Sequence, residues 1–523
     1  RGDRAWVTLQ ASGERVAIEL ARLEVAARID VGRDPRAIAA RGTGVIAITR
    51  WRSTDGAATV AIVDASDPSA PVLVGDTLLP RETGVDSDTD NNGVLSFLGA
   101  IVPSPDGGRV LLPALKANVV SGTFRGDRPL TTQTTARAAL AEVSLGAPGE
   151  PGRDTFRFPF DDLDLASAAV FSPMGERVYV AMQGAEVVVA IDAFRFDSVG
   201  SIDDVGHAPQ GLALDPSGRF LFVHAYLSRA VRVYDVSDLT REPEALAEIA
   251  IAPEPFSSEV LRGAIIFHSS RDERMSRTRY LSCASCHMDG EADGLTWDFT
   301  QRGEGLRNTI PLRGRAGAAH GPMHWSANFD EVQDFEHDIR GGQGGTGFLA
   351  DDVFHVGTRD TTLGDAKTGL SPELDALAAY VSSLDRFGRS PHRRGGDSEW
   401  EASRARGETI FRDPTVGCAT CHAGPRYTDS AFAIDRTPLL HDVGTLAAGS
   451  GARLGTALTG LDTPTLRGLW STAPYLHDGS APTLRAVLRE RNTDDRHGIT
   501  SMLTDTQLTD LETFLLALDD LAP

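Results

Sequence analysis

Two stretches decide how this chain folds: Cys283-Ala284-Ser285-Cys286-His287 and Cys418-Ala419-Thr420-Cys421-His422. Both have the C-x-x-C-H spacing at which two thiols add across the vinyl groups of a c-type haem and the adjacent histidine ligates the iron. The alternatives for paired cysteines are a zinc site, a thioredoxin-like dithiol or two disulfides. Because the two motifs use all four cysteines and both continue into histidine, the sequence predicts two covalently bound haems c, with these proximal iron ligands: His287 and His422.

The two motifs lie in two similar segments. Residues 257–268 and 402–411 have helical patterning, contain Arg-Gly near their middle, and lead into a haem motif. Residues 372–384 and 506–518 are expected to be the closing helices of the two segments. We therefore expect a first c-type haem domain over residues 256–395 and a second over residues 396–523, both mainly α-helical.

Residues 1–252 alternate between short β-branched strands and tight turns, as in β-hairpins. The turns that begin at Pro173 and Pro216 are 43 residues apart, which is the period of a β-propeller blade. Blades are expected to start near Pro35, Leu98, Ala166 and Pro209, with strand-like sequence before the first. A seven-bladed ring would need about 300 residues, so either some blades are irregular or residues upstream of Arg1 complete the ring. The expected fold class is multidomain: an all-β propeller followed by two mainly helical cytochrome c-type domains.

Charge and hydropathy exclude several classes of protein. The chain has 51 basic and 73 acidic side chains, a net charge of −22, which argues against nucleic acid and anionic lipid as partners. No apolar run approaches the roughly 20 residues of a membrane span. No signal peptide begins at Arg1, so we expect the numbering to start on a processed or truncated chain. Covalent haem attachment takes place outside the cytoplasm, which predicts a periplasmic or secreted protein.

Further stretches extend the pattern around the haem motifs: Arg307-Asn308-Thr309, His324-Trp325, His441-Asp442-Val443-Gly444-Thr445, Thr463-Pro464-Thr465-Leu466-Arg467 and Thr472-Ala473-Pro474-Tyr475-Leu476-His477-Asp478-Gly479. In these motifs, over about residues 257–520, the chain resembles the bacterial di-haem cytochrome c peroxidase and MauG family. Its N-terminal half resembles the YVTN-type propeller family in its turns. The resemblance implies that Trp325 lies between the haems as an electron relay, although a core tryptophan is the alternative. It also implies an inter-domain calcium ion held by oxygen atoms of three residues: Asn308, Thr472 and Pro474.

At the first haem the chain departs from the family. No histidine lies between Met288 and Ala319, where the peroxidases have a capping histidine, so the first haem is either open or capped by His320 or His324. The family's distal glutamate aligns with the glycine run at residues 341–347. Glu336, with the neighbouring His337, is the nearest acid–base candidate, and a solvated surface glutamate is the alternative.

At the second haem the family has a methionine or tyrosine where this chain has Arg491, which stays protonated and cannot ligate iron. The local substitutes are His497 and Met502. We favour His497, with a solvated loop histidine as the alternative. Histidine in place of methionine lowers the potential of a haem.

These features predict a peroxide-dependent oxidoreductase with an open first haem that shares electrons with a six-coordinate second haem. The distal candidates at the first haem are His320, His324 and Glu336. The expected reactants are hydrogen peroxide or O₂, together with a small redox donor protein or a protein or organic substrate. Three alternatives remain: a rubber-oxygenase-like dioxygenase, a non-catalytic electron carrier, and a binding or sensing protein in which the propeller is the active part.

Overall fold

The computed structural model describes residues 4–42 and 44–520, which form two compact units. The first unit is assigned Arg1–Val120, Thr131–Ser285 and Gln343–Thr346, and the second Ser121–Leu130, Cys286–Gly342 and Gly347–Pro523. Residues 253–285 thus belong to the first unit. The predicted boundaries of the two haem domains stay a prediction. Among the described residues, no helix is long and apolar enough to cross a membrane.

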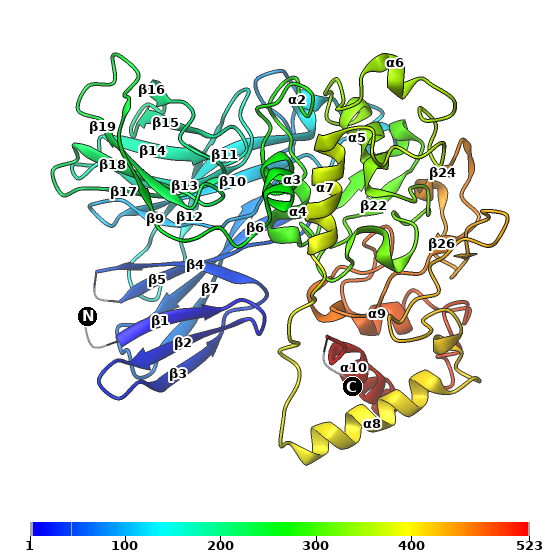
Figure 1. The fold of residues 1–523 in the computed structure, drawn as a ribbon. Helices are drawn as coiled ribbons and strands as arrows, with labels where there is room; N and C mark the ends of the chain where they lie inside the picture. The colour runs from blue at the N-terminus through cyan, green and yellow to red at the C-terminus, as the bar shows by residue number, and fades with distance from the viewer. Residues whose placement is uncertain (1–3, 43, 521–523) are drawn as a thin grey trace. The chain divides into compact units, whose positions relative to one another are not determined.

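The described part of the first unit contains five antiparallel sheets that follow one another in chain order (Figure 1). Three of the expected blade starts, Pro35, Ala166 and Pro209, are the first residues of a sheet. The fourth, Leu98, lies in the connection between the first two strands of a sheet that begins at Val94. This half is therefore all-β, and its sheets follow one another along the chain as the blades of the expected propeller would. The strands by sheet are β1–β3 (Arg4–Leu9, Glu14–Glu19, Glu24–Asp30), β4–β7 (Pro35–Arg41, Val45–Arg50, Ala57–Asp64, Val72–Pro80), β8–β12 (Val94–Ser96, Val102–Pro103, Arg109–Ala117, Ala136–Ser144, Arg153–Pro159), β13–β16 (Ala166–Phe171, Arg177–Met182, Val187–Asp192, Ser198–Ile202) and β17–β20 (Pro209–Leu214, Phe220–Ala225, Ala230–Asp235, Ala245–Ala250).

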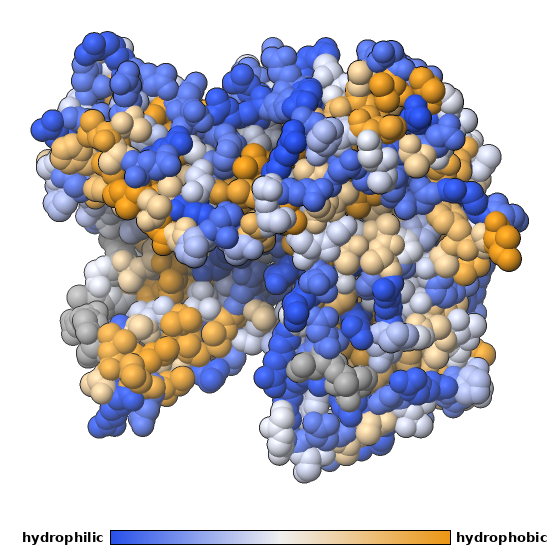
Figure 2. Space-filling model, in the orientation of Figure 1, coloured by the Kyte–Doolittle hydropathy of each residue, from blue (hydrophilic) through white to orange (hydrophobic). Residues whose placement is uncertain are grey.

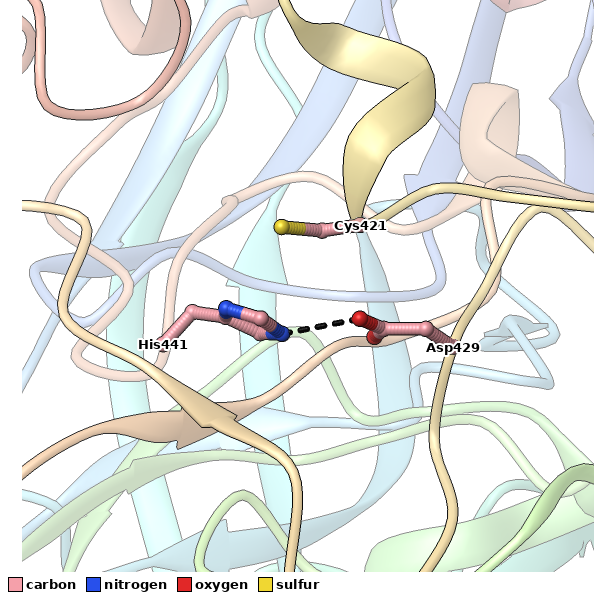
Figure 3. A group of neighbouring side chains, drawn as sticks. All are labelled: Cys421, Asp429 and His441. Atoms are coloured by element: carbon pink, nitrogen blue, oxygen red, sulfur yellow. Dashed lines mark hydrogen bonds and ion pairs between the residues drawn. The ribbon is translucent and has the colours of Figure 1, made fainter.

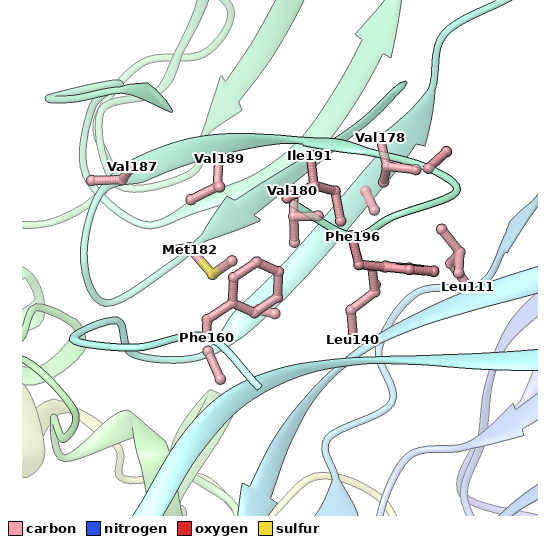
Figure 4. Packing of buried hydrophobic residues seen from close by; sticks show 14 of the residues in the cluster. Leu111, Leu140, Phe160, Val178, Val180, Met182, Val187, Val189, Ile191 and Phe196 are labelled. Atoms are coloured by element: carbon pink, nitrogen blue, oxygen red, sulfur yellow. The ribbon is translucent and has the colours of Figure 1, made fainter. Parts of the chain in front are cut away.

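Alternation along the strands builds the propeller core (Figure 4). In β14, Val178, Val180 and Met182 point to one side of the sheet and are fully buried. They pack against Leu111 and Leu140, which β10 and β11 of the preceding sheet supply. Because successive strand residues face opposite sides, a period of two places one apolar row in each inter-sheet core.

The first sheet differs from the others in having three strands. Its β2–β3 hairpin leaves three large apolar side chains exposed, Leu20, Leu23 and Val25. Figure 2 shows these strands, drawn in blue in Figure 1, as an apolar surface. The β2–β3 hairpin is therefore one of the exposed apolar surfaces of the first unit.

The helices predicted to lead into and close the haem segments are present. They are α3 (Ser258–His268), α7 (Pro372–Ser383), α8 (Ser398–Arg412) and α10 (Asp505–Leu516). The Arg-Gly pair of α8 has a packing role, because a Cβ on Gly407 would lie 2.0 Å from the Asp510 carbonyl oxygen of α10. Arg406 Nε donates to the Asp510 carboxylate at 2.7 Å.

The remaining helices of the chain are short: α1 (Thr123–Gly126), α2 (Thr132–Thr135), α4 (Ala284–His287), α5 (Glu336–Gly341), α6 (Asp351–Phe354) and α9 (Leu484–Leu488). The second unit also contains the paired strands β21 and β22 (Thr296–Asp298, Leu306–Asn308), β23 and β26 (Leu440–His441, Leu461–Asp462), and β24 and β25 (Ala452–Arg453, Thr456–Ala457). Much of this unit is therefore loop, and its long-range hydrogen bonds fix the positions of the candidate residues.

Candidate haem-binding sites

The first haem motif is anchored through its middle residue. Ser285, on α4, is 1% exposed and donates from Oγ to Asp164 Oδ1 at 2.9 Å. Asp164 follows the β12 strand of the propeller and is fully buried. Burial raises the pKa of Asp164 to about 7, and its Oδ2 has no hydrogen-bond partner among the described residues.

The second haem motif lies on a 3₁₀ turn, Cys418–Thr420, which begins after Gly417 in a left-handed conformation. Cys418 packs against the cluster that contains Phe411, Val416 and Phe514. Burial raises the pKa of the Cys418 thiol to about 11. Cys418 and Cys421, the two cysteines of this motif, form no disulfide with a described residue.

Both proximal histidines are neutral imidazoles suited to iron. Burial lowers the pKa of His287 to about 4 and lowers the pKa of His422 as well. His422 Nδ1 lies 3.2 Å from the Tyr427 carbonyl oxygen, which leaves Nε2 as the free nitrogen. A ligating histidine typically donates its other nitrogen to such an acceptor. Two cysteines at C-x-x-C spacing beside a buried neutral imidazole therefore fit covalent haem c at both motifs.

His497 lies opposite His422. Their ring centres are 6.2 Å apart and their planes are inclined by 33°. Metal–imidazole bonds are about 2.0 Å long, so one metal ion between two axial imidazoles holds the ring centres roughly 6.3 Å apart. Burial, and then the His422 imidazole, lower the pKa of His497 to about 4. The other substitute, Met502, is 57% exposed.

Asn492 holds the loop that presents His497, a role that the sequence analysis missed. Asn492 is buried, and its Oδ1 accepts from the His497 amide at 2.8 Å. Its Nδ2 donates to the Gly498 carbonyl oxygen at 2.8 Å. An Asn a few residues before a candidate ligand is a weak signal by itself, since many loops contain one.

Three residues are candidates for the distal side of the first haem. Among the described residues, His324 is the candidate that interacts electrostatically with His287. After burial, the His324 imidazole contributes to lowering the pKa of His287. Its ring centre lies 4.4 Å from that of Phe329 and 5.3 Å from that of Phe335. Its Nδ1 lies 2.7 Å from Asn328 Oδ1. His324 is thus oriented by a hydrogen bond and packs against two aromatic rings.

His320 and Glu336 have other surroundings. The His320 ring centre is 6.0 Å from that of Phe387, and burial followed by nearby arginines lowers the pKa of His320 to about 4. Glu336 is fully buried, unlike a solvated helix residue. Its carboxylate accepts from the Phe348 and Leu349 amides at 2.8 and 3.1 Å, and from Arg340 Nε at 2.8 Å. Glu336 therefore holds the loop that follows α5.

Trp325 joins the two haem segments within the second unit. Its Nε1 donates to the Asn308 carbonyl oxygen at 2.9 Å, and its own carbonyl oxygen accepts from the Asp462 amide at 2.8 Å. Its ring centre is 6.4 Å from that of His477, in the second segment. This position agrees with the predicted relay but does not test it.

The three predicted calcium ligands lie close to this junction. Asn308 Nδ2 is 2.5 Å from the Pro474 carbonyl oxygen, while Asn308 Oδ1 is buried and has no hydrogen-bond partner in residues 4–42 and 44–520. The Thr472 hydroxyl donates a hydrogen bond to the Leu469 carbonyl oxygen at 3.1 Å. The carbonyl oxygen of Thr472 is therefore the atom of this residue that could ligate calcium. The two amide atoms of asparagine are assigned by their hydrogen bonds, and a rotated amide would place two oxygens side by side, as a cation requires.

A cluster of three polar side chains lies at the second motif: Cys421, Asp429 and His441 (Figure 3). His441 Nε2 lies 2.9 Å from Asp429 Oδ2, and the sulfur of Cys421 is within 4.8 Å of the ligand atoms of both. Cysteine, aspartate and histidine at this spacing could hold a metal ion in isolation. Because the sulfur of Cys421 belongs to the haem motif, we assign Asp429 and His441 to the surroundings of the second haem.

Known proteins resemble this chain as follows. A family model described as "RoxA-like, cytochrome c-like" matches residues 460–497. Hydrazine synthase subunit gamma of Kuenenia stuttgartiensis is 33% identical over 316 residues, which cover 53% of this chain and 83% of that protein. Methylamine utilization protein MauG of Methylorubrum extorquens is 28% identical over 282 residues, which cover 47% of this chain and 72% of that protein.

Two further matches are more distant. Cytochrome c peroxidase Ccp of Escherichia coli is 22% identical over 295 residues, which cover 51% of this chain and 60% of that protein. A solved structure of Kuenenia stuttgartiensis hydrazine synthase matches with a TM-score of 0.37 and 17% identity, over 45% of this chain and 69% of that one.

Proposed function

The chain belongs to the family of hydrazine synthase subunit gamma, MauG and cytochrome c peroxidase, and on this premise we propose that it is a peroxide-dependent di-haem enzyme. It is an oxidoreductase with covalently bound haem c. The proposal concerns the oxidant, the division of roles between the two haems and the residues that carry each role.

The observation that carries the proposal is the difference between the two distal sides. His497 lies near His422, with ring centres 6.2 Å apart, so these two residues could together hold an iron ion. His324 acts on His287 electrostatically but is held by Asn328 through Nδ1. This supports a second haem closed by two histidines and a first haem that keeps a position for a reactant, with a histidine nearby.

A haem c held by Cys283, Cys286 and His287 would supply the iron chemistry that peroxide reduction needs. In our proposal His324 Nε2 takes the proton from the inner peroxide oxygen and delivers it to the outer oxygen, as general acid–base catalysis requires. Phe329 and Phe335 pack against this side chain, which is 28% exposed. Trp325, the next residue, carries electrons between the sites.

We further propose that Ca²⁺ joins the two haem segments. The support is the buried Asn308 Oδ1 without a partner, beside the Pro474 carbonyl oxygen. Backbone and amide oxygens are suitable calcium ligands. With Thr472 as the third protein donor, such an ion would stabilise the segment whose carbonyl group accepts from Trp325.

A dioxygenase is the second candidate function, and the aromatic enclosure of His324 is the observation that favours it. An apolar wall suits O₂ as well as peroxide, and both activities need an open first haem. A first haem whose ferrous form holds O₂ stably would favour the dioxygenase.

The expected location and partners follow from chemistry and charge. Covalent attachment of haem c outside the cytoplasm supports a periplasmic or secreted protein. The net charge of −22 would attract a basic redox donor or protein substrate and accelerate their encounter. Such association would weaken as salt is raised.

Optical and EPR spectra of the oxidised protein, before and after one equivalent of hydrogen peroxide, test the proposal. We expect one high-spin and one low-spin ferric haem, and rapid loss of the high-spin signal after peroxide. The same spectra of His324→Gln should keep the high-spin signal after peroxide, and His355→Gln is its matched control, because His355 contacts a carboxylate, Asp360, but is exposed. Two low-spin haems that do not react with peroxide would leave electron transfer or sensing as the function.

A further inference from the structure

His324 is the first member of a chain of hydrogen bonds that ends in a buried ion pair. Its Nδ1 lies 2.7 Å from Asn328 Oδ1, and Asn328 Nδ2 donates to the Glu304 carboxylate. The same carboxylate accepts from Arg307 Nε at 2.9 Å and from Ser326 Oγ at 2.9 and 3.0 Å. No motif in the sequence singled out Glu304 or Asn328.

Glu304 is held as an anion by its partners. Its side chain is 14% exposed, and the Arg307 side chain is 7% exposed. A carboxylate paired with a guanidinium is ionised and can only accept hydrogen bonds. The group that faces it from Asn328 must therefore be the NH₂ group, not the oxygen.

The orientation of Asn328 determines the proton on His324. With NH₂ facing Glu304, the Asn328 oxygen faces His324 Nδ1 and can only accept. Nδ1 therefore carries the proton, and a neutral imidazole with Nδ1–H has a lone pair on Nε2. The carboxylate of Asp338 is 4.0 Å from Nε2, beyond hydrogen-bond distance.

The backbone of this loop is held from the second haem segment. Arg453 donates from Nε to the Ser326 carbonyl oxygen at 2.7 Å and from Nη2 to the Ala327 carbonyl oxygen at 3.2 Å. His324 has a φ of 68°, in the left-handed region that residues other than glycine rarely adopt. A strained backbone persists where its surroundings determine it fully, as they do here.

We propose that Glu304, acting through Asn328, is a positioning group that fixes the tautomer of His324 and keeps Nε2 as the base on the first haem side. This rests on the proposed function, in which His324 transfers the proton. Asn328 and Glu304 are positioning residues, because they reach the reactant only through His324. A histidine free to change tautomer would carry the proton on Nε2 for part of the time. During that time Nε2 could not accept a proton.

Cyanide binding to the oxidised holoprotein tests the proposal without peroxide. Hydrogen cyanide must give its proton to a base when it binds ferric iron as cyanide, so the association rate reports the state of Nε2. We expect Asn328→Leu to slow cyanide association by about 10- to 100-fold, the usual cost of losing a partner that orients a ligand or base. Asn328→Asp retains an oxygen for Nδ1 and should restore part of the rate. Glu304→Gln allows the Asn328 amide to rotate and should give an intermediate rate.

A double-mutant cycle separates positioning from general damage to the fold. If Asn328 acts through His324, Asn328→Leu has no further effect in a His324→Gln background. The EPR signal of the second haem should be unchanged in every variant, and Asn92→Leu in the propeller controls for an Asn-to-Leu change elsewhere. A cyanide rate unaffected by Asn328→Leu, or slowed equally without His324, would overturn the proposal.

The same variants separate this proposal from the proposed function. If the first haem of the unaltered protein is low-spin and closed to cyanide, the open-haem function fails. The EPR g values of the first haem then decide the tautomer proposal. A shift caused by Asn328→Leu would support the proposal, because a ligating His324 would also depend on its Nδ1–H bond, and unchanged g values would reject it.

Discussion

The two haem motifs have the same five-residue pattern but different surroundings. In the first, Ser285 is 1% exposed and bonded to the buried Asp164. In the second, the matching residue, Thr420, is exposed. The attachment chemistry is thus the same at both motifs. What differs is how each motif is enclosed and which residues reach the distal side.

The distal sides extend the comparison. His497 is presented to His422 by a loop that the buried Asn492 holds. His324 is presented by a strained turn and is bonded through Nδ1 to a network. One arrangement brings two imidazoles to ligand separation, and the other orients one imidazole without doing so. The proposed division of roles between the haems therefore depends on a few loop residues.

The largest expected effect comes from removing the base at the first haem. We expect His324→Gln to lower the rate of reaction with peroxide by about 100- to 10,000-fold, the usual contribution of a general acid–base group. Stopped-flow spectroscopy with excess peroxide measures this rate. The low-spin signal of the second haem should stay unchanged, and a similar loss in His355→Gln would show that the effect is not specific.

The second haem should respond to its own distal residue. His497→Ala removes one of the two imidazoles, so we expect the low-spin ferric signal of this haem to become high-spin. His497→Met should raise its reduction potential by on the order of 100 mV, a fraction of the span that axial ligands cover. EPR and redox titration measure both changes. An unchanged low-spin spectrum in His497→Ala would break the comparison, because Met502 or another group would then be the ligand.

Short-range patterns predicted the parts of this molecule that depend on nearby residues. The C-x-x-C-H motifs, the helix before each motif and the blade starts at Pro35, Ala166 and Pro209 all follow from local spacing. The roles of Asp164, Glu304 and Asn492 could not be predicted in this way. Each depends on a contact brought about by folding, and Asp164 and Ser285 are 121 positions apart in the chain. Glu336 shows the reverse error, because a helical glutamate looks solvated in sequence but is fully buried by the loop it holds.

The enclosure of the first motif should make stability depend on pH. The pKa of Asp164 is raised to about 7 in the folded protein, above the value of about 3.9 in an unfolded chain. The folded state therefore binds the extra proton, and stability falls as pH rises between these values. Asp164→Asn should remove this loss and stabilise the protein at pH 8 by on the order of 2 kcal/mol.

Thermal unfolding of the holoprotein between pH 5 and 8 measures the effect of Asp164→Asn. The gain in melting temperature should increase with pH up to about pH 7 and then level off. Asp215→Asn is the matched control, because hydrogen bonds lower the pKa of that carboxylate to about 2, below the range tested. An equal gain at pH 5 and pH 8 would contradict a titrating Asp164.

The smallest expected effect concerns the junction that the two segments share. Removing Ca²⁺ with a chelator should slow electron exchange between the haems several-fold, because the ion would stabilise the Asn308 segment that accepts from Trp325 Nε1 at 2.9 Å. Asn308→Ala should give the same slowing and make the protein insensitive to the chelator. Metal analysis together with the rate of inter-haem electron transfer after partial reduction measures both effects. The calcium proposal would be wrong if the purified protein contained no calcium and exchanged electrons at the same rate with and without chelator. Asn308 would then join the two segments through its hydrogen bonds, without a metal ion.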